Sequence, residues 1–105
     1  MVGKYKVITL CGSAKFKEDF LREQQRLTLA GHIVLSMNFF DNLATEQLDN
    51  PNTIAMLKDM LKKKIDMSDE IFVINKGGYI GASTLDEIEY AKMTNKKVNY
   101  MENIE

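Results

Sequence analysis

The residue best placed to do chemistry is a carboxylate, Glu87, near the start of a predicted helix. The helix follows a glycine-rich loop, residues 75–83, which contains three of the six glycines of the chain. Ser83 is a good N-cap residue, which would put Asp86 and Glu87 in the first helical turn. The helix dipole then favours the charged form of Glu87, which suits a nucleophile or a hydrogen-bond acceptor better than a general acid. Simple dipole complementation is the alternative for Glu87, and we expect Asp86 to act as a capping-box partner of Ser83.

A second loop that could bind a ligand lies near the amino end, where Gly12, Ser13 and Lys15 follow an apolar run. Backbone N–H groups, the Ser13 hydroxyl and the Lys15 ammonium could together hold a phosphate or a carboxylate. The glycine spacing and the lysine position match neither a Walker A loop nor a dinucleotide-binding fingerprint. A plain tight turn capped by Ser13 is the alternative interpretation.

Glycines and aromatic residues could shape a pocket beside these loops. Gly78, Tyr79 and Gly81 belong to the glycine-rich loop, where small residues let a ligand approach the backbone. Phe39 and Phe40 follow a predicted strand. They could cover a base or a sugar, or they could pack into the core, and the sequence leaves both roles open.

Other reactive side chains lack the partners that chemistry needs. Cys11 has no accompanying His and Asp, so we interpret it as a packed thiol, and His32 has no neighbour at metal or triad spacing. No cluster has metal-ligand spacing, so we expect neither a metal nor a cofactor. The lysines of one predicted helix are expected on a solvated face, and its methionines in the core or at a subunit interface: Lys58, Lys62, Lys63 and Lys64, and Met56, Met60 and Met67.

Hydrophobic periodicity predicts strands that alternate with helices. The predicted strands cover residues 4–11, 32–37, 70–75 and 98–101. The predicted helices cover residues 16–30, 51–67 and 83–95, with a helical turn near residues 43–48. Asn50 followed by Pro51 gives a clean helix start, with asparagine at the cap and proline in the first turn.

This order predicts one α/β domain over residues 1–105, a small doubly wound, flavodoxin-like or Rossmann-like three-layer sandwich. We expect a parallel sheet of about four strands and about three helices. In such folds ligands bind beyond the carboxyl ends of the strands, where the strand order reverses. A 2-1-3-4 order puts the reversal between the first and third strands, so the two glycine-bearing loops should border one pocket.

Composition limits the classes of function. The formal net charge of −1 and the pI of about 5.8 argue against binding to a nucleic-acid polymer, which needs a clearly basic surface. One cysteine excludes an internal disulfide and suits a reducing compartment. No signal peptide or membrane-spanning stretch is recognisable, so we expect a cytoplasmic protein without a membrane partner. A domain of 105 residues buries a small core, so we expect a homodimer or a larger homo-oligomer.

Two motifs occur together: Leu-Cys-Gly-Ser at residues 10–13, and Gly-Ala-Ser-Thr-Leu-Asp-Glu-Ile-Glu-Tyr-Ala at residues 81–91. This combination resembles the nucleoside 2-deoxyribosyltransferase superfamily, which includes the deoxynucleoside 5′-monophosphate N-glycosidases. The resemblance implies that Glu87 attacks the anomeric carbon of the sugar and that the first loop binds phosphate. It also implies that Ser83 and Asn75 orient the sugar and the nucleophile.

The chain departs from the family pattern at two positions. Glu89 replaces a usual glycine, and Asn75 stands where the family usually carries an aspartate that helps protonate the base or orient the sugar. An amide can form hydrogen bonds but cannot act as an acid. The sequence therefore leaves three possibilities: an enzyme that cleaves or transfers the N-glycosidic bond of a nucleoside or nucleotide, a non-catalytic nucleotide-binding sensor or regulatory module, and a structural domain. In the family a neighbouring subunit often completes the site, and residues 102–105 could do so here.

Overall fold

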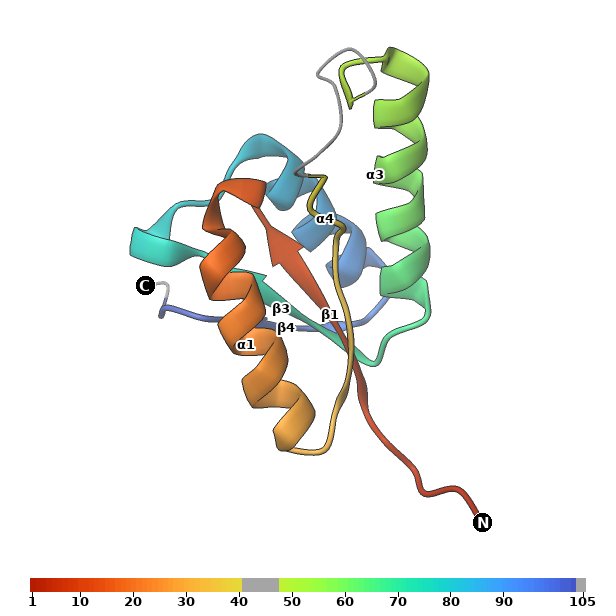
Figure 1. Cartoon of the computed structure of the whole chain (residues 1–105). Helices are drawn as coiled ribbons and strands as arrows, with labels where there is room; N and C mark the ends of the chain where they lie inside the picture. Colours follow the sequence, from red (N-terminus) through yellow and green to blue (C-terminus); the bar gives the residue numbers. More distant parts are fainter. Residues whose placement is uncertain (41–47, 104–105) are drawn as a thin grey trace.

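The computed structural model describes residues 1–40 and 48–103 (Figure 1). The strands form a parallel sheet with the order β2-β1-β3-β4. The strands are β1 (Val7–Gly12), β2 (Ile33–Leu35), β3 (Glu70–Ile74) and β4 (Lys97–Tyr100). The helices are α1 (Lys17–Leu29), α3 (Pro51–Asp66) and α4 (Ala82–Met93), with 3₁₀ turns η1 (Ala14–Phe16) and η2 (Lys76–Gly78). The predicted α/β class, doubly wound arrangement and strand order are confirmed. The helical turn predicted near residues 43–48 falls almost wholly outside the described residues.

The sheet has a core on each face, because alternate residues of its central strands point in opposite directions. On one face, Phe20 and Leu27 of α1 pack with side chains of the two central strands: Ile8, Leu10 and Ile74. On the other face, Ile65 of α3 and Ile88 of α4 pack with a second set, Cys11, Ile71, Val73 and Ala91. Right-handed crossovers account for this division, with α1 on one face and both other helices on the opposite face.

The start of α3 agrees with its predicted cap. Asn50 Oδ1 accepts a hydrogen bond from the Asn52 N–H at 2.8 Å, and Pro51 occupies the first turn. Cap and proline act on their own stretch of backbone, so local sequence is enough to fix this start. Among the described helices, none is both long and apolar enough to cross a membrane.

The start of α4 differs from the prediction. Gly81, in an extended conformation, is the N-cap, and no side chain caps the helix, so the prediction that Ser83 does so is wrong. Asp86 is not a capping-box partner either, because its carboxylate lies 3.3 Å from the Lys62 ammonium. Glu87 is the sixth residue of the helix, and the first turn contains no acidic residue. The dipole complementation expected from the sequence is therefore absent from this helix start.

The register of β1 against β3 brings the two glycine loops together. Gly12 ends β1 and pairs with Ile74, which ends β3. The backbones come so close that a Cβ atom on Gly12 would lie 2.9 Å from the Ile74 carbonyl oxygen. Only glycine fits this approach, and the two loops leave the sheet side by side.

Candidate functional site

A cleft of about 450 Å³ opens beside the carboxyl ends of β1 and β3, where the strand order reverses. Its polar wall comes from the loop after β1, the amino end of α4 and the second turn of α4. The opposite wall comes from α3 and the segment after β2. The volume is in the range of small-molecule sites.

Six of the residues predicted from the sequence line this cleft together: Gly12, Ser13, Tyr79, Gly81, Ser83 and Glu87. The two glycine loops and Glu87 therefore face one space, as the topology predicts. Whether these residues bind a nucleotide stays a prediction.

Glu87 is 9% exposed, and its Oε1 has no hydrogen-bond partner among the residues that the structure describes. Burial raises the pKa of Glu87 from 4.5 to about 7, against the lowering effect of its interaction with the Cys11 thiol. The Asp86 charge raises this pKa further, and the charges of Lys58 and Lys62 lower it. The predicted preference for the charged form is wrong, because Glu87 lies buried in the second turn. At neutral pH both protonation states are present, so this carboxyl can act as a nucleophile or exchange a proton.

Cys11 lies behind Glu87 and does not line the cleft. Its side chain is buried in the core between the sheet and the helices α3 and α4. Burial first, and then the nearby Glu87 carboxyl, raise the pKa of the Cys11 thiol well above its usual value. A neutral thiol in apolar surroundings agrees with the prediction of a packed residue.

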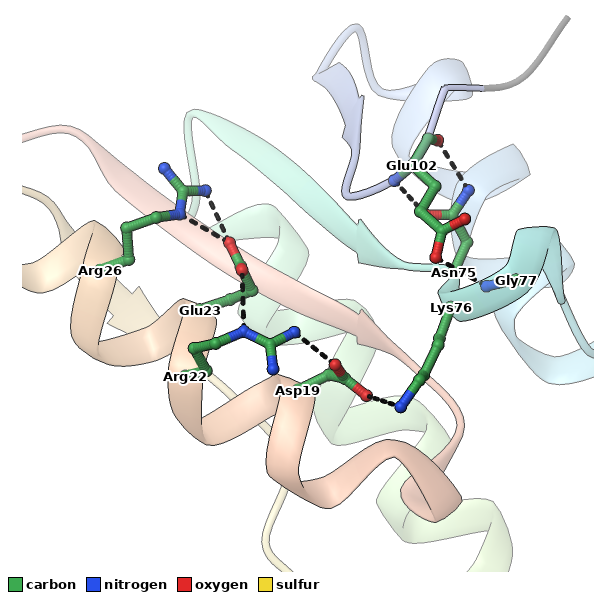
Figure 2. Close-up of polar contacts among 8 residues, drawn as sticks. All are labelled: Asp19, Arg22, Glu23, Arg26, Asn75, Lys76, Gly77 and Glu102. Atoms are coloured by element: carbon green, nitrogen blue, oxygen red, sulfur yellow. Dashed lines mark hydrogen bonds and ion pairs between the residues drawn. The ribbon is translucent and has the colours of Figure 1, made fainter.

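Asn75, predicted to act in the site, is not among the cleft residues. Its side chain is fully buried, its Nδ2 donates to the Glu102 carbonyl at 3.0 Å, and its Oδ1 accepts from the Glu102 N–H at 2.8 Å (Figure 2). Both polar ends of the amide are thus used within the fold, and a direct role of Asn75 in catalysis stays a prediction. Glu102, one of the residues that could complete the site of a neighbouring subunit, is engaged within its own chain, and residues 104–105 lie outside the described part.

The loop after β3 is anchored on two sides. The Glu102 carboxylate accepts a hydrogen bond from the Gly77 N–H at 2.7 Å. Lys76 reaches in the other direction, with its ammonium 3.6 Å from the Asp19 carboxylate on α1 (Figure 2). These contacts hold the loop that carries Tyr79 and Gly81 to the cleft.

Lys15 and Gly78 also lie outside the cleft lining. The Lys15 ammonium sits 3.5 Å from the centroid of the Tyr79 ring, and the same ring meets Phe16 edge-on at 5.9 Å. In this structure the Lys15 ammonium therefore lies against an aromatic ring and not in the cleft lining, and its predicted phosphate contact stays a prediction. Ser13 Oγ accepts from the Lys15 N–H at 3.3 Å, in agreement with the capping interpretation of that loop.

The sequence did not lead us to predict that α3 contributes side chains to the cleft. Its apolar side chains form much of one cleft wall: Leu57, Met60 and Leu61. Lys58 and Lys64, predicted on a solvated face, also line the cleft, and the Lys64 ammonium donates to the Ser36 carbonyl at 2.7 Å. Spacings of three and four residues put these positions on one side of the helix, which was the available signal.

The two phenylalanines after β2 divide the roles that the sequence left open. Phe40 lines the cleft, together with Met37 and Asn38. Phe39 packs edge-on against the buried Phe20, with 5.4 Å between ring centroids. Only Phe40 is therefore placed to cover a ligand.

Comparisons with models of protein families, with curated proteins and with solved structures give no match to this chain. Within residues 1–40 and 48–103, no group of three or more His, Cys, Asp or Glu side chains is arranged to hold a metal ion. The chemistry of the cleft and the motifs of the sequence are therefore the basis for assigning a function.

Proposed function

We propose that this protein cleaves or transfers the N-glycosidic bond of a nucleoside or nucleotide, with Glu87 as the nucleophile. The observation that carries the proposal is the position of this side chain. It is a nearly buried carboxyl group with one oxygen that no described residue satisfies, in a cleft shared with both glycine loops. The resemblance of residues 10–13 and 81–91 to the nucleoside 2-deoxyribosyltransferase superfamily points to the same residue.

The reaction proceeds in two displacements at the anomeric carbon. In the first, a carboxylate oxygen of Glu87 bonds to this carbon while the carbon–nitrogen bond breaks, and the electron pair leaves with the base. In the second, water or another base attacks the same carbon and releases the carboxylate, so the configuration is retained. Glu87 is the one carboxyl among the described residues of the main cleft, so the departing base takes its proton from solvent.

The two walls of the cleft suit the two ends of such a substrate. Ser13 and Ser83 offer hydroxyl groups to the sugar and its substituents, next to backbone that glycine leaves accessible. Phe40 and Leu57 offer apolar surface to the base on the other side. Tyr79 lies at the same cleft with its ring half exposed, so a base can pack against it.

A specific observation favours the second candidate, a non-catalytic nucleotide-binding sensor or regulatory module. The aspartate expected after β3 is replaced by Asn75, whose amide is withdrawn into contacts with Glu102. In the part of the cleft that the structure describes, no second carboxyl can then protonate a departing base. A protein of this kind binds the nucleotide and leaves it intact.

We also propose that the protein works in the cytoplasm as a homodimer or a larger homo-oligomer. Met56 and Met60 on α3 are 52% and 44% exposed, and Met60 borders the cleft. A second copy that covers them would bury apolar surface. Cys11 is free and buried, which is compatible with a reducing compartment. Sedimentation equilibrium tests the assembly, and a monomer at high protein concentration would contradict it.

The test of the proposed reaction uses a panel of nucleosides and nucleoside 5′-monophosphates, with free base measured by chromatography. Glu87→Gln keeps the shape of the side chain and removes its nucleophilicity, so the rate should fall at least about a hundredfold. Glu89→Gln is the matched control, because Glu89 lies two residues further along the same helix and is exposed.

Three outcomes decide between the candidates. Release of base by wild type but not by Glu87→Gln, with a sugar adduct on Glu87 detected by mass spectrometry after acid quenching, supports the enzyme. Equal rates for wild type and Glu87→Gln contradict the nucleophile assignment. Nucleotides that raise the melting temperature and are recovered intact support the binding module.

A further inference from the structure

Lys64, a partly buried residue of α3, belongs to the cleft wall that is otherwise largely apolar, with Leu57, Met60 and Leu61 as its neighbours. We propose that the Lys64 ammonium donates a hydrogen bond to an acceptor atom of the base, either a ring nitrogen or a carbonyl oxygen. This bond selects the base and becomes stronger as the base departs. The inference rests on the proposed function for the kind of ligand, and it adds the residue that recognises the base.

A hydrogen bond holds the Lys64 ammonium at the cleft. The ammonium donates to the Ser36 carbonyl at 2.7 Å. Ser36 directly precedes Met37 and Asn38, which line the same cleft, so this bond keeps the ammonium beside the cleft instead of extended into solvent. An ammonium group has three N–H donors, and the bond to Ser36 uses one. The other two have no partner among the residues that the structure describes, so they are available to a ligand.

The backbone of Lys64 is fixed as well. Its carbonyl oxygen accepts a hydrogen bond from the Ser68 hydroxyl at 2.8 Å, and the Thr9 hydroxyl lies 3.1 Å from the same oxygen. Both hydroxyl residues are buried, and Thr9 belongs to the central strand β1. Lys64 is therefore held to the sheet at its backbone and to the segment after β2 at its ammonium. A donor that is held in place before the ligand arrives needs little reorganisation during a reaction.

The charge of Lys64 is not neutralised by a carboxylate among the described residues, whereas Lys62 is paired with Asp86 and Lys76 with Asp19. A charge-assisted hydrogen bond is stronger beside apolar side chains than in water. Lys58, the other lysine of the cleft, is exposed, and no described hydrogen bond or ion pair holds it. Lys64 is thus the better-positioned donor. An aromatic base fits this wall, because its faces are apolar and its edge carries acceptors.

The same contact supplies what the leaving base needs. When the carbon–nitrogen bond breaks, its electron pair stays on the base nitrogen, and the negative charge spreads over the acceptor atoms of the ring. An ammonium fixed at one of these atoms stabilises the transition state more than the ground state, which raises the rate. Lys64 keeps its proton in this step, and the base takes its proton from solvent. The departure of the base is therefore assisted without a second carboxyl group in the cleft.

A purely structural role is the alternative, in which Lys64 only ties α3 to the segment after β2. A tie of this kind would affect every ligand equally. A contact with the base instead makes the effect of Lys64 depend on one acceptor atom of the ligand. The experiment therefore changes the lysine and the acceptor atoms together.

Binding is measured by titration calorimetry in the Glu87→Gln background, so that no ligand is consumed. The ligands are 2′-deoxyadenosine with its 1-deaza, 3-deaza and 7-deaza analogues, and 2′-deoxyuridine with its 2-thio and 4-thio analogues. Each analogue removes or weakens one acceptor atom. Lys64→Met keeps most of the side-chain length and removes the donors, and Lys64→Gln keeps a neutral donor that can still reach Ser36. Lys63→Met is the matched control, because Lys63 is exposed and outside the cleft lining.

We expect Lys64→Met to weaken the better-bound parent nucleoside about tenfold, and Lys63→Met to change its affinity less than about twofold. One analogue of that nucleoside should bind about tenfold more weakly than the parent and lose nothing further in Lys64→Met. Lys64→Gln should show a smaller loss with the same dependence on that acceptor, which answers the question if Lys64→Met does not fold. Losses that simply add for every analogue, or no binding of either nucleoside, would overturn the contact.

A kinetic comparison tests the assistance to the leaving base. In the protein with Glu87 intact, Lys64→Met should lower kcat about a hundredfold for the nucleoside, and less than about threefold for 4-nitrophenyl 2-deoxyriboside, whose leaving group needs no assistance. Equal losses for both substrates would show a structural role. These results are distinct from a failure of the proposed reaction. If binding depends on Lys64 and one acceptor atom but no base is released, the contact stands and the nucleophile proposal does not. If Lys64→Met releases and binds every base as wild type does, the reverse holds.

Discussion

Replacing Glu87 by Gln should stabilise the folded protein at neutral and alkaline pH. The wild-type carboxyl must ionise in a buried position, and burial raises its pKa from 4.5 to about 7. Between these two values the unfolded chain has lost the proton and the folded chain has kept it. Stability therefore falls as pH rises from about 4.5, and it stops falling above about 7, where both states are ionised.

The size of this effect follows from the same two values. A pKa raised from 4.5 to about 7 corresponds to about 3 kcal/mol of lost stability at pH 8, and to almost none near pH 4.5. Glutamine has nearly the same shape and does not titrate, so Glu87→Gln does not lose this stability as the pH rises. The expected gain over wild type is thus about 3 kcal/mol at pH 8, less what the new amide loses by being buried without full hydrogen bonding.

The assay is urea unfolding of both proteins at several pH values from 4.5 to 8. Glu89→Gln is the control, because Glu89 lies two residues further along the same helix and its side chain is exposed. It should leave the pH dependence of wild type almost unchanged. If the free energy of unfolding of Glu87→Gln falls with pH as steeply as that of wild type, Glu87 is not the group that titrates, and the burial of its carboxyl has been misjudged.

Three further predictions concern the cleft and its supports. The rate of base release should rise about tenfold from pH 6 to pH 8, as the carboxylate fraction of Glu87 grows through a pKa of about 7; a flat pH–rate profile would contradict this. Asn75→Ala should lower the free energy of urea unfolding by about 2 kcal/mol, because it leaves the backbone N–H and carbonyl of Glu102 without their side-chain partner. A free energy of unfolding equal to that of wild type within error would show that water replaces the amide. Gly12→Ala should destabilise the folded protein by about 1–3 kcal/mol in thermal unfolding, because the new methyl group would lie 2.9 Å from the Ile74 carbonyl oxygen. A variant as stable as wild type would mean that the two strands can move apart there at no cost.

The fold could be predicted because its signals are local. Apolar runs fix the strands, and the Asn50 cap with Pro51 fixes the start of α3. The strand order then follows from the handedness of the crossovers, and with it the meeting of the two glycine loops. The meeting of these loops also predicts that Ser13 and Glu87 border one cleft, as they do in the structure.

The features that the sequence did not predict depend on contacts between distant segments. The side chain of Asn75 points to Glu102, 27 residues away, and local sequence gives no sign of that partner. The start of α4 depends on the backbone path of the preceding loop, which lets Gly81 take the cap position instead of Ser83. Lys58 reaches the cleft because α3 packs beside α4, and a charge pattern alone is equally compatible with a solvated face.

Two other buried carboxyl groups, on α1, differ from Glu87 in having cationic partners. Asp19 and Glu23 on α1 are 4% and 8% exposed, comparable with Glu87. Asp19 is paired with Arg22, and Glu23 lies 2.7 Å from the Arg26 guanidinium (Figure 2). Each of these acidic groups is thus compensated by a cation on its own helix, as buried charges generally are.

Glu87 has no ion-pair partner of this kind on its own helix. One of its oxygens has no partner among the described residues, and burial raises its pKa by more than the Cys11 thiol and the Lys58 and Lys62 charges lower it. A carboxyl that served only stability would gain from a cation or from replacement by an apolar side chain, since leaving it buried and unsatisfied costs free energy. Among the described residues, this carboxyl lies where both glycine loops and the uncapped start of α4 border a cavity. Perturbed and unsatisfied groups concentrate at sites that act on ligands, which is the physical basis for our proposal that Glu87 has a functional role.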